Sequence, residues 1–210
     1  NKELKEVVIL FAGDSGDGIQ LTGTQFTNTN ALFGNDISTF PNFPAEIRAP
    51  AGTLAGVSGF QLNFGSVNIY TAGDEADVLV VMNAAALKAS LHSLKKNGVI
   101  IANTAGFDPK SLELAKYPKG IHPLQDGSLS NYTVHEIDVT KLTRLCLEGS
   151  GLGVKEIDRS KNMFVLGFIL WMYNRSTEPT LNFLKEQFKK RPELIETNTK
   201  VLKAGYNYGD

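Results

Sequence analysis

The amino-acid sequence predicts an α/β fold, a layered domain with a mostly parallel sheet, helices on both of its faces and a helical C-terminal part. Three observations predict it. Short apolar, β-rich runs alternate with stretches of helical periodicity in the first part of the chain. The first of these runs leads directly into a glycine-rich elbow. From residue 139 onward the pattern is helical to the end. We expect residues 1–210 to form a single domain, since no repeat, low-complexity segment or long linker divides them.

The first predicted strand covers residues 7–12, VVILFA, which are apolar on both faces, as in a central strand covered by helices on both sides. After the elbow, apolar residues at helical intervals predict a helix over 19–34. A second strand is expected over 36–43, ended by prolines. The stretch 44–76 is rich in Gly, Pro and Ala and then alternates apolar and polar residues, which predicts a long functional loop followed by a strand pair.

Two more buried strands are predicted at 77–83 and 98–104, with a helix over 84–97 between them whose lysine-rich end precedes Gly98. This βαβ unit has the clearest pattern in the sequence. Weaker strands are expected at 120–126 and 133–139. The remaining predicted helices cover residues 139–151, 161–174, 179–192 and 193–209.

Composition and charge exclude several kinds of partner. The chain is 42% hydrophobic and 20% charged, which is typical of a soluble globular protein. Its formal net charge of -1 creates no overall field, so we expect neither nucleic acid nor a membrane as a partner. The longest apolar run, 163–173, is too short to span roughly 30 Å of hydrocarbon. Because the N-terminal residues lack the pattern of an export signal, we expect a cytoplasmic protein.

Metal and catalytic signatures are also missing from the sequence. The single cysteine, Cys146, can form no internal disulfide and cannot hold an iron–sulfur cluster or a structural zinc, which need several ligands. The three histidines lack metal-site spacing, so no metal ligand is predicted. Since no nucleophile stands at a recognisable spacing from a base, no catalytic residue is predicted on this chain.

The glycine elbow raises the question of a dinucleotide site. Gly13, Gly16 and Gly18 follow the pattern GxxGxG, whereas the dinucleotide fingerprint is GxGxxG, and Ser15 occupies a position where a second glycine is expected. The acidic residue that should contact a ribose at the end of the second strand is missing as well. The elbow therefore fits a Rossmann-like turn better than an NAD or FAD site.

Two carboxylates, Asp14 and Asp17, lie inside the elbow and would repel a diphosphate unless a cation intervenes. Two interpretations stay open. The elbow is either a tight strand-to-helix turn, with Asp17 stabilised by the helix dipole, or a weaker contact for a phosphate or for a partner subunit.

The stretch FPNFPAEIRAPAGTLAGVSG, residues 40–59, carries only two charges, Glu46 and Arg48. Arg48 can present a planar, permanently charged donor to a phosphate or a carboxylate. Alternatively, an ion pair of Arg48 with Glu46 or Asp17 fixes the loop. If Arg48 reaches the elbow, its charge compensates the aspartates there.

Polar residues follow two predicted strands. Asn83 comes after the strand at 77–83, and Asn103 and Thr104 come at the end of the strand at 98–104. Ligands of open α/β sheets bind beyond the carboxyl ends of the strands, so these side chains are candidates for polar contacts. Asparagine is also a common turn residue, and a purely structural role is the alternative.

Five stretches, in this order, resemble the gamma domain of the 2-oxoacid:ferredoxin oxidoreductases. They are GDSGDGIQLTG, FPAEIRAPAGTLAGVSGFQLNFGS, GDEADVLVVMNAAAL, GVIIANT and KNMFVLG. The resemblance covers most of residues 7–175, and its most specific part is PAEIRAPAGTLAGVSGFQ. It is nearest to the form that is fused to the alpha subunit in 2-oxoglutarate-type enzymes, so the chain is either a separate gamma subunit or, as we expect, a piece of a fused alpha subunit.

The resemblance implies a function for the complex. Enzymes of this family decarboxylate a 2-oxoacid on thiamine diphosphate, pass electrons through iron–sulfur clusters to ferredoxin and transfer the acyl group to coenzyme A. Their gamma domain is a Rossmann-like α/β unit that carries neither thiamine diphosphate nor a cluster. It packs against the thiamine-binding alpha and beta domains and is implicated in coenzyme A binding. The isolated chain is therefore expected to be inactive.

Carried over by position, the elbow glycines, the acid-x-Arg loop and the strand-end asparagines of the family all have counterparts here. Ser15 and Asp17 depart from the family pattern, with Asp17 standing where many relatives carry glutamine. The residues predicted to contribute to coenzyme A binding are Gly13, Ser15, Gly16, Asp17, Gly18, Glu46, Arg48, Asn83, Asn103 and Thr104. Two other functions are weighed against this one, a purely structural subunit-interaction module and an independent nucleotide-binding oxidoreductase.

Overall fold

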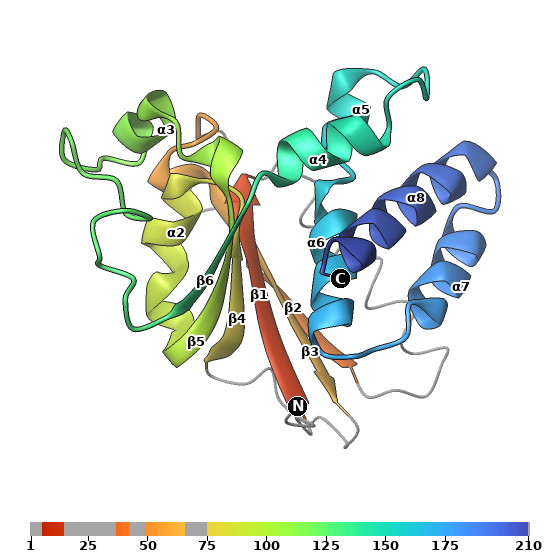
Figure 1. Cartoon of the computed structure of the whole chain (residues 1–210), viewed down its shortest axis with the longest axis horizontal. Helices are drawn as coiled ribbons and strands as arrows, with labels where there is room; N and C mark the ends of the chain where they lie inside the picture. The colour runs from red at the N-terminus through yellow and green to blue at the C-terminus, as the bar shows by residue number, and fades with distance from the viewer. Residues whose placement is uncertain (1–5, 15–36, 43–48, 66–74, 210) are drawn as a thin grey trace.

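The computed structural model describes residues 6–14, 37–42, 49–65 and 75–209 (Figure 1). Within these ranges the fold is built on a six-stranded sheet in the order β2-β3-β1-β4-β5-β6. The strands are β1 (Glu6–Asp14), β2 (Ile37–Asn42), β3 (Val57–Gly65), β4 (Ala76–Val81), β5 (Leu94–Asn103) and β6 (Thr133–Ile137).

The sheet is mostly parallel, as predicted. Strand β1 pairs in parallel with β4, β4 with β5, and β5 with β6. Strand β3 runs against this direction and pairs antiparallel with both β1 and β2. It lies in the stretch 44–76, for which the sequence predicts a long loop followed by a strand pair. Residues 66–74 of that stretch lie outside the described residues. The helix predicted over 19–34 lies outside the described residues.

Helices cover both faces of the sheet (Figure 1), which confirms the predicted α/β layering. On one face lie α2 and α3, and on the other lie α6 and the helices packed around it. No helix in the described ranges combines the length and apolarity needed to cross a membrane. The α-helices are α2 (Ala84–Ser90), α3 (Pro109–Leu114), α4 (Val139–Cys146), α5 (Val154–Asp158), α6 (Lys161–Met172), α7 (Glu178–Gln187) and α8 (Pro192–Tyr208).

Strand β1 shows why the apolar run at the start of the sequence is buried on both sides. Val7, Ile9 and Phe11 belong to the core that includes α6 and α8. Val8 and Leu10 alternate with them and belong to the core that includes α2. Successive side chains of a strand point to opposite faces, so one strand contributes to both cores. Burying each such side chain fully contributes roughly 1.5–3 kcal/mol.

The predicted helix over 84–97 is wrong in its second half. Helix α2 ends at Ser90, the short 3-10 helix η3 (Leu91–Ser93) follows, and β5 already begins at Leu94. Leu94 pairs with Ala76 of β4 across a register shift, and Asn97 adopts a φ of 60° there. Lys95 and Lys96 therefore lie in the irregular first part of β5 and not at the end of a helix. There Lys95 Nζ forms an ion pair with Asp77 Oδ1 of the neighbouring strand β4, at 2.7 Å.

The predicted strand at 120–126 is also wrong, because these residues form consecutive turns. The carbonyl of His122 accepts from the backbone N–H groups of both Gln125 and Asp126, each at 2.9 Å. Gly120 and Gly127 have φ values of 82° and 79°, which interrupt extended backbone. The loop thus connects α3 to β6 without adding a strand.

In the C-terminal part the four predicted helices exist with different ends, and the short helix α5 between the first two was not predicted. Helix α4 stops at Cys146, ahead of Gly149 and Gly151, whose φ values are 77° and 76°. Pro192, predicted to lie at the end of a helix, is the first residue of α8. Proline is favoured there because a first-turn N–H has no partner within the helix.

Candidate functional site

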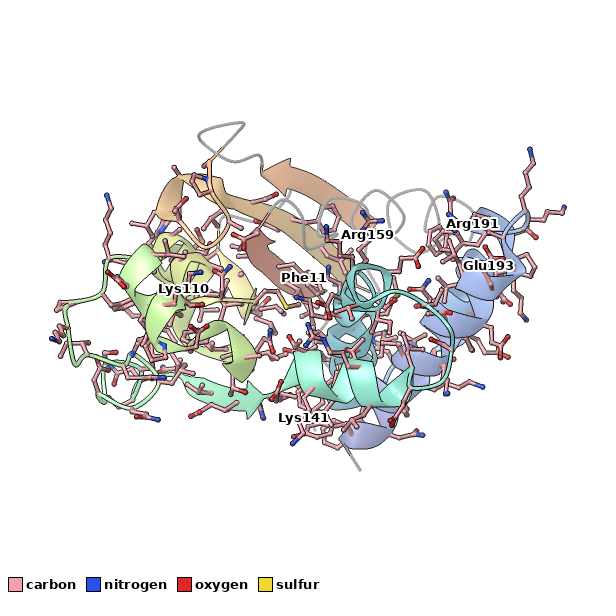
Figure 2. The ribbon with its side chains drawn as sticks, turned by 90° about the horizontal axis from the view of Figure 1, so that it is seen from above. Phe11, Lys110, Lys141, Arg159, Arg191 and Glu193 are labelled. Atoms are coloured by element: carbon pink, nitrogen blue, oxygen red, sulfur yellow. The ribbon has the colours of Figure 1, made fainter. Side chains whose placement is uncertain are left out.

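The candidate site lies at the carboxyl edge of the parallel strands, which is the upper edge of the sheet in Figure 1. Strands β1, β4, β5 and β6 point the same way and end at this edge. Figure 2 looks down on it, with Lys110 on α3 and Lys141 on α4 labelled on the helices that flank it. Open α/β sheets bind ligands at such an edge.

The structure describes four of the predicted site residues. Gly13 lies in β1, Asn83 follows β4, Asn103 ends β5, and Thr104 begins the 3-10 helix η4 (Thr104–Gly106). All four therefore belong to strands that end at the carboxyl edge or directly follow them. The other predicted residues lie outside the described ranges: Ser15, Gly16, Asp17, Gly18, Glu46 and Arg48.

Asn83 caps the N-terminus of α2. Its Oδ1 accepts from the backbone N–H of Ala86 at 2.8 Å, and its own backbone is extended. An asparagine in this position satisfies one of the donors that the first helical turn leaves without a partner. The Asn83 side chain is 8% exposed and is engaged in holding α2 at the end of β4.

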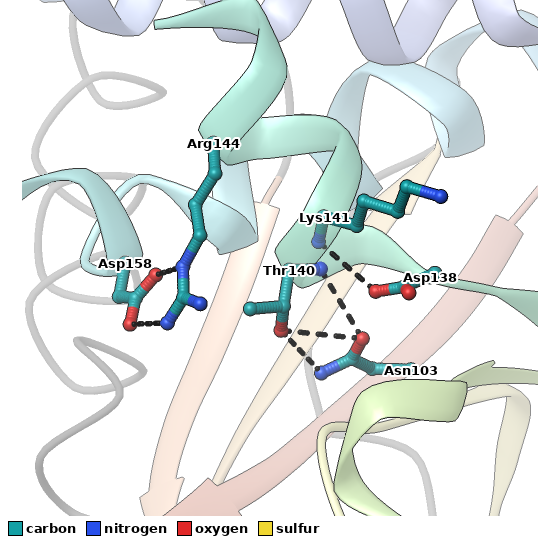
Figure 3. A network of polar contacts seen from close by, with 6 residues as sticks. All are labelled: Asn103, Asp138, Thr140, Lys141, Arg144 and Asp158. Carbon is teal, nitrogen blue, oxygen red and sulfur yellow. Dashed lines mark hydrogen bonds and ion pairs between the residues drawn. The ribbon is translucent and has the colours of Figure 1, made fainter. Parts of the chain in front are cut away.

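Asn103 joins β5 to two neighbouring elements, and Figure 3 shows its contacts with Thr140 of α4. Its Nδ2 donates to Thr140 Oγ1 at 3.0 Å and to the Met82 carbonyl at 3.3 Å. Its Oδ1 accepts from the Thr140 backbone N–H at 3.3 Å. The side chain is buried, and both ends of its amide are bonded to protein. Asn103 thus holds the end of β4 and the first turn of α4 against the end of β5.

Close packing places η4 directly on the end of β4. A Cβ atom on Gly106 would overlap the Met82 carbonyl oxygen and lie 2.6 Å from Asn83 Cα. Only glycine permits this approach between two segments of backbone. The approach fixes the turn that carries Thr104, whose carbonyl accepts from the Phe107 N–H at 3.1 Å.

Asp14, the last residue of β1, contacts a turn at residues 50–53. Its Oδ1 accepts from the Gly52 N–H at 2.8 Å, across 38 residues of sequence. From the sequence Asp14 is a charge that opposes a phosphate, and the contact with Gly52 is not predicted. No local pattern could have found it, because the two residues meet only when the sheet forms.

Helix α4 contributes charged groups beside the Asn103 network (Figure 3). Asp138 caps the helix by accepting from the Lys141 backbone N–H at 2.9 Å. Arg144 forms a two-pronged pair with Asp158, with Nε to Oδ1 at 2.9 Å and Nη2 to Oδ2 at 2.8 Å. The hydrogen bonds from Arg144 hold the pKa of the Asp158 carboxyl below its ordinary value. This pair fixes α5 against α4.

An open hollow of about 400 Å³ lies between η4 and α4. Thr140 and the exposed Leu145 form part of its wall, and four charged side chains line it: Asp138, Lys141, Arg144 and Glu148. The two cations are matched by two carboxylates, so the hollow has no charge preference for an anion. Nowhere in the described ranges do three His, Cys, Asp or Glu side chains gather as a metal site would require.

Comparison with known proteins relates the whole chain to one family. Residues 8–208 match the family described as pyruvate ferredoxin/flavodoxin oxidoreductase. The chain is 51% identical over 209 residues to the 2-oxoglutarate oxidoreductase subunit KorA of Mycobacterium tuberculosis. That match covers 100% of this chain and 32% of KorA, so the chain spans about a third of the length of this relative.

Three solved structures share the fold. The 2-oxoglutarate:ferredoxin oxidoreductase of Magnetococcus marinus matches 98% of this chain and 31% of its own, with a TM-score of 0.71 and 24% identity. The gamma subunit of a keto/oxoacid ferredoxin oxidoreductase from Geobacter sulfurreducens has a TM-score of 0.65 at 16% identity, with 97% of this chain and 98% of that subunit covered. The pyruvate oxidoreductase subunit PORC of Thermotoga maritima has a TM-score of 0.60 at 17% identity, with 97% of both chains covered.

The two smaller neighbours are matched over nearly their whole length, and in the larger enzyme the match covers about a third of the chain. The same fold thus occurs as a separate subunit and as part of a longer chain. Together with the family match and the identity to KorA, this confirms the resemblance found in the sequence. The chain belongs to the pyruvate ferredoxin/flavodoxin oxidoreductase family.

Proposed function

We propose that this chain is the gamma domain, folded as one unit, of a 2-oxoglutarate:ferredoxin oxidoreductase, and that it helps to bind coenzyme A and to assemble the complex. The observation that carries the proposal is the 51% identity to KorA over the full chain. The structure from Magnetococcus marinus contains 2-oxoglutarate, coenzyme A and succinyl-CoA, which supports coenzyme A as a ligand of the complex.

In the proposed reaction 2-oxoglutarate loses carbon dioxide, its acyl group passes to the thiol of coenzyme A, and an electron pair passes to ferredoxin. The iron–sulfur clusters belong to other domains in this proposal, because the single cysteine of this chain cannot supply the ligands of a cluster. Thiamine diphosphate is placed on other domains by the resemblance to the family. The thiamine-binding alpha and beta parts are its partners, and ferredoxin meets the complex rather than this domain alone. The isolated chain is inactive in this proposal, and the complex is cytoplasmic.

The chain's contribution to coenzyme A binding is electrostatic and positional. Coenzyme A carries several phosphate charges, and Arg48 offers a planar cation that can donate to a phosphate in a bidentate manner. The remaining residues of the proposed contact surface are Gly13, Ser15, Gly16, Asp17, Gly18 and Glu46. Asn83 and Asn103 act in this proposal by holding the ends of β4 and β5, since their amide groups are engaged within the protein.

Replacing Arg48 by Ala in the assembled enzyme tests the proposal. Loss of a charge-assisted hydrogen bond costs about 1.5–3 kcal/mol, so the KM for coenzyme A should rise about ten- to a hundredfold. The KM for 2-oxoglutarate should stay unchanged, since the oxoacid is bound by other domains. Steady-state kinetics with each substrate varied in turn measures both values.

Arg191→Ala is the matched control. Arg191 is an exposed arginine paired with Glu193 at 3.0 Å, and Figure 2 places it far from the carboxyl edge. Its loss should leave both KM values unaltered. Unchanged coenzyme A kinetics in Arg48→Ala would refute the proposed contact. In that case coenzyme A can be titrated into the protein in a calorimeter. If no heat of binding appears while the subunits still co-purify, the chain is better described as a purely structural subunit-interaction module.

A further inference from the structure

The exposed side of helix α4 carries a short pattern of side chains that is complementary to itself. Lys141 and Leu145 belong to α4, and Glu148 follows shortly after its last residue, so that the three stand at positions i, i+4 and i+7 of one helical stripe. We propose that this stripe pairs with the same stripe of a second copy of the chain, around a two-fold axis. The pairing is separate from coenzyme A binding and does not depend on it.

Leu145 is the apolar centre of the stripe. It is 55% exposed and forms part of the wall of the open hollow beside η4. The buried residues Val139 and Leu147 attach this segment to the core, so Leu145 is not needed for that purpose. A single exposed leucine is common on protein surfaces. Leu145 differs because a charged side chain of opposite sign lies on each side of it along the stripe.

Lys141 and Glu148 are the charged ends of the stripe. Both side chains are exposed, and neither forms an ion pair within the part of the chain that the structure describes. The nearby Arg144 is different, because two hydrogen bonds join its guanidinium to Asp158. Figure 3 shows Arg144 turned toward Asp158 on one side of α4 and Lys141 extending away on the other. One positive and one negative group are therefore available to a partner.

The spacing of the three residues fits a two-fold axis. At about 1.5 Å per residue, Lys141 precedes Leu145 by about 6 Å along the helix and Glu148 follows it by about 4.5 Å. The Glu148 N–H donates to the Leu145 carbonyl at 3.3 Å, so the helical path continues as far as Glu148. In an antiparallel pair each Lys141 then faces the Glu148 of the other copy, and the two Leu145 side chains meet near the axis.

A second copy is the partner that this pattern fits, because the stripe supplies both halves of its own complement. A two-fold interface uses the same patch on both subunits and must match itself in this way. An unrelated partner would need the reverse order of charges around an apolar residue. Complementary charges of this kind mainly set the partner and the register of an interface.

The fold holds the stripe on a fixed backbone. Asp138 accepts from the Lys141 backbone N–H at 2.9 Å, and Asn103 accepts from the Thr140 backbone N–H at 3.3 Å at the end of β5. The first turn of α4 is thus bonded on two sides before any partner arrives. A preorganised surface loses little conformational entropy on binding, which favours pairing even through a small contact.

The contact is nevertheless small for a protein interface. Stable interfaces bury about 1,600 Å², and one short helix from each copy offers less than that. We therefore expect weak self-association that depends on the concentration of the chain. In an assembled enzyme with two copies of the chain, this contact would add to the other subunit contacts.

The test reverses the two charges singly and together in the full chain. Lys141→Glu and Glu148→Lys each place like charges opposite one another at two symmetric points, so the Kd of self-association should rise about tenfold or more. The double variant Lys141→Glu/Glu148→Lys restores opposite charges across the axis, and its Kd should return to within about threefold of wild type. Sedimentation equilibrium measures each Kd.

Salt gives a second readout of the same contact. Screening weakens attraction and repulsion alike. Raising the salt concentration should therefore increase the Kd of the wild type and of the double variant, and lower the Kd of both single variants.

Leu145→Asp tests the apolar centre and should also raise the Kd about tenfold or more. Because Leu145 is exposed, the melting temperature of the dilute variant should stay within about 2 °C of wild type. Lys185→Glu is the matched control, since it makes the same change in net charge as Lys141→Glu at an exposed lysine of α7. Its Kd should equal that of the wild type.

A chain that stays monomeric at millimolar concentration overturns the proposal, and so does a double variant that associates no better than the single ones. If the chain stays monomeric and Leu145→Asp prevents co-purification with the thiamine-binding parts, the stripe binds another part of the enzyme and not a second copy. None of these measurements involves coenzyme A, so the kinetics of Arg48→Ala test the proposed function separately.

Discussion

At the scale of the residue, Asn103 illustrates how one amide side chain can hold a sheet edge together. It bonds Met82 at the end of β4 and Thr140 at the start of α4. The side chain is 3% exposed, so losing it would leave protein groups at this edge without partners. A buried polar group without a partner is costly, and the network is therefore worth more to stability than its individual bonds suggest.

Asn103→Ala should accordingly lower the free energy of unfolding by about 1–3 kcal/mol. Thr140→Val removes the partner hydroxyl while it keeps the branched shape. Since the two side chains interact directly, the double variant should cost less than the sum of the single ones, with a coupling of about 0.5 kcal/mol or more. Urea unfolding of the four proteins measures each term.

The exposed Asn207 supplies the control for this cycle, and Asn207→Ala should change stability by no more than about 0.5 kcal/mol. Strictly additive effects of Asn103→Ala and Thr140→Val would show that the two side chains do not act as a unit. In that case the contact seen in Figure 3 would contribute little to the edge.

At the scale of the element, the crossing of α6 and α8 depends on two glycines. A Cβ atom on Gly167 of α6 would overlap the carbonyl oxygen of Leu202, and one on Gly205 of α8 would overlap that of Phe164. The helices therefore touch backbone to backbone on both sides of the crossing. This close approach lets α8 cover the apolar surface of α6, nine of whose residues are buried.

Gly167→Ala and Gly205→Ala should each destabilise the protein by about 1–3 kcal/mol or more, because the added methyl group forces the helices apart. Thermal and urea unfolding measure the loss. Gly153→Ala is the control, since its Cβ would lie 3.8 Å from the nearest atom, Glu156 Oε2, and the backbone φ there is -71°. Equal stability of all three variants would mean that the helices can separate without cost.

Elements with a strong and uniform pattern could be predicted from the sequence, and those shaped by pairing could not. The run 7–12 and the apolar helix α6 were found because their burial on all sides leaves an unbroken apolar stretch. The sequence predicts that the segment 94–97 ends a helix, since lysines are common at helix ends. Strand pairing with Ala76 and the contact of Lys95 with Asp77 outweigh that local preference.

At the scale of the whole molecule, the topology of the sheet determines that the described residues of the candidate site lie at one edge. Parallel strands end together, so the sequence could place Asn83 and Asn103 at one edge without knowing their contacts. It could not show that both amides are bonded within the protein, nor that Asp14 meets Gly52, which depends on where β3 lies beside β1. The antiparallel pairing of β3 with β1 brings the turn at residues 50–53, which precedes β3, next to Asp14 at the end of β1.

The dependence of stability on pH is also a property of the whole chain. His135 on β6 packs edge-on against Phe168 of α6, with ring centroids 5.5 Å apart, and burial lowers its pKa below 6.5. The unfolded chain then binds a proton more readily than the folded one, so stability falls as the pH drops from about 6.5 through the folded pKa.

The pKa of Asp158 is lowered from 3.8 by the hydrogen bonds of Arg144. Its stabilisation is present above the unfolded pKa and is lost as the pH falls through the folded pKa.

Both groups act in the same direction, so the melting temperature should decline in two stages, one below about pH 6.5 and one below about pH 4. Thermal unfolding from pH 7.5 to 2.5 measures the profile. His135→Gln should flatten the first stage because it removes the titrating ring, and Asp158→Asn should flatten the second. The effect of Asp158→Asn should be small, since the half-exposed Arg144 pair is screened by solvent. If the melting temperature of His135→Gln still declines below about pH 6.5 as in the wild type, other groups cause that decline. The contact between β6 and α6 would then tolerate a charged imidazole.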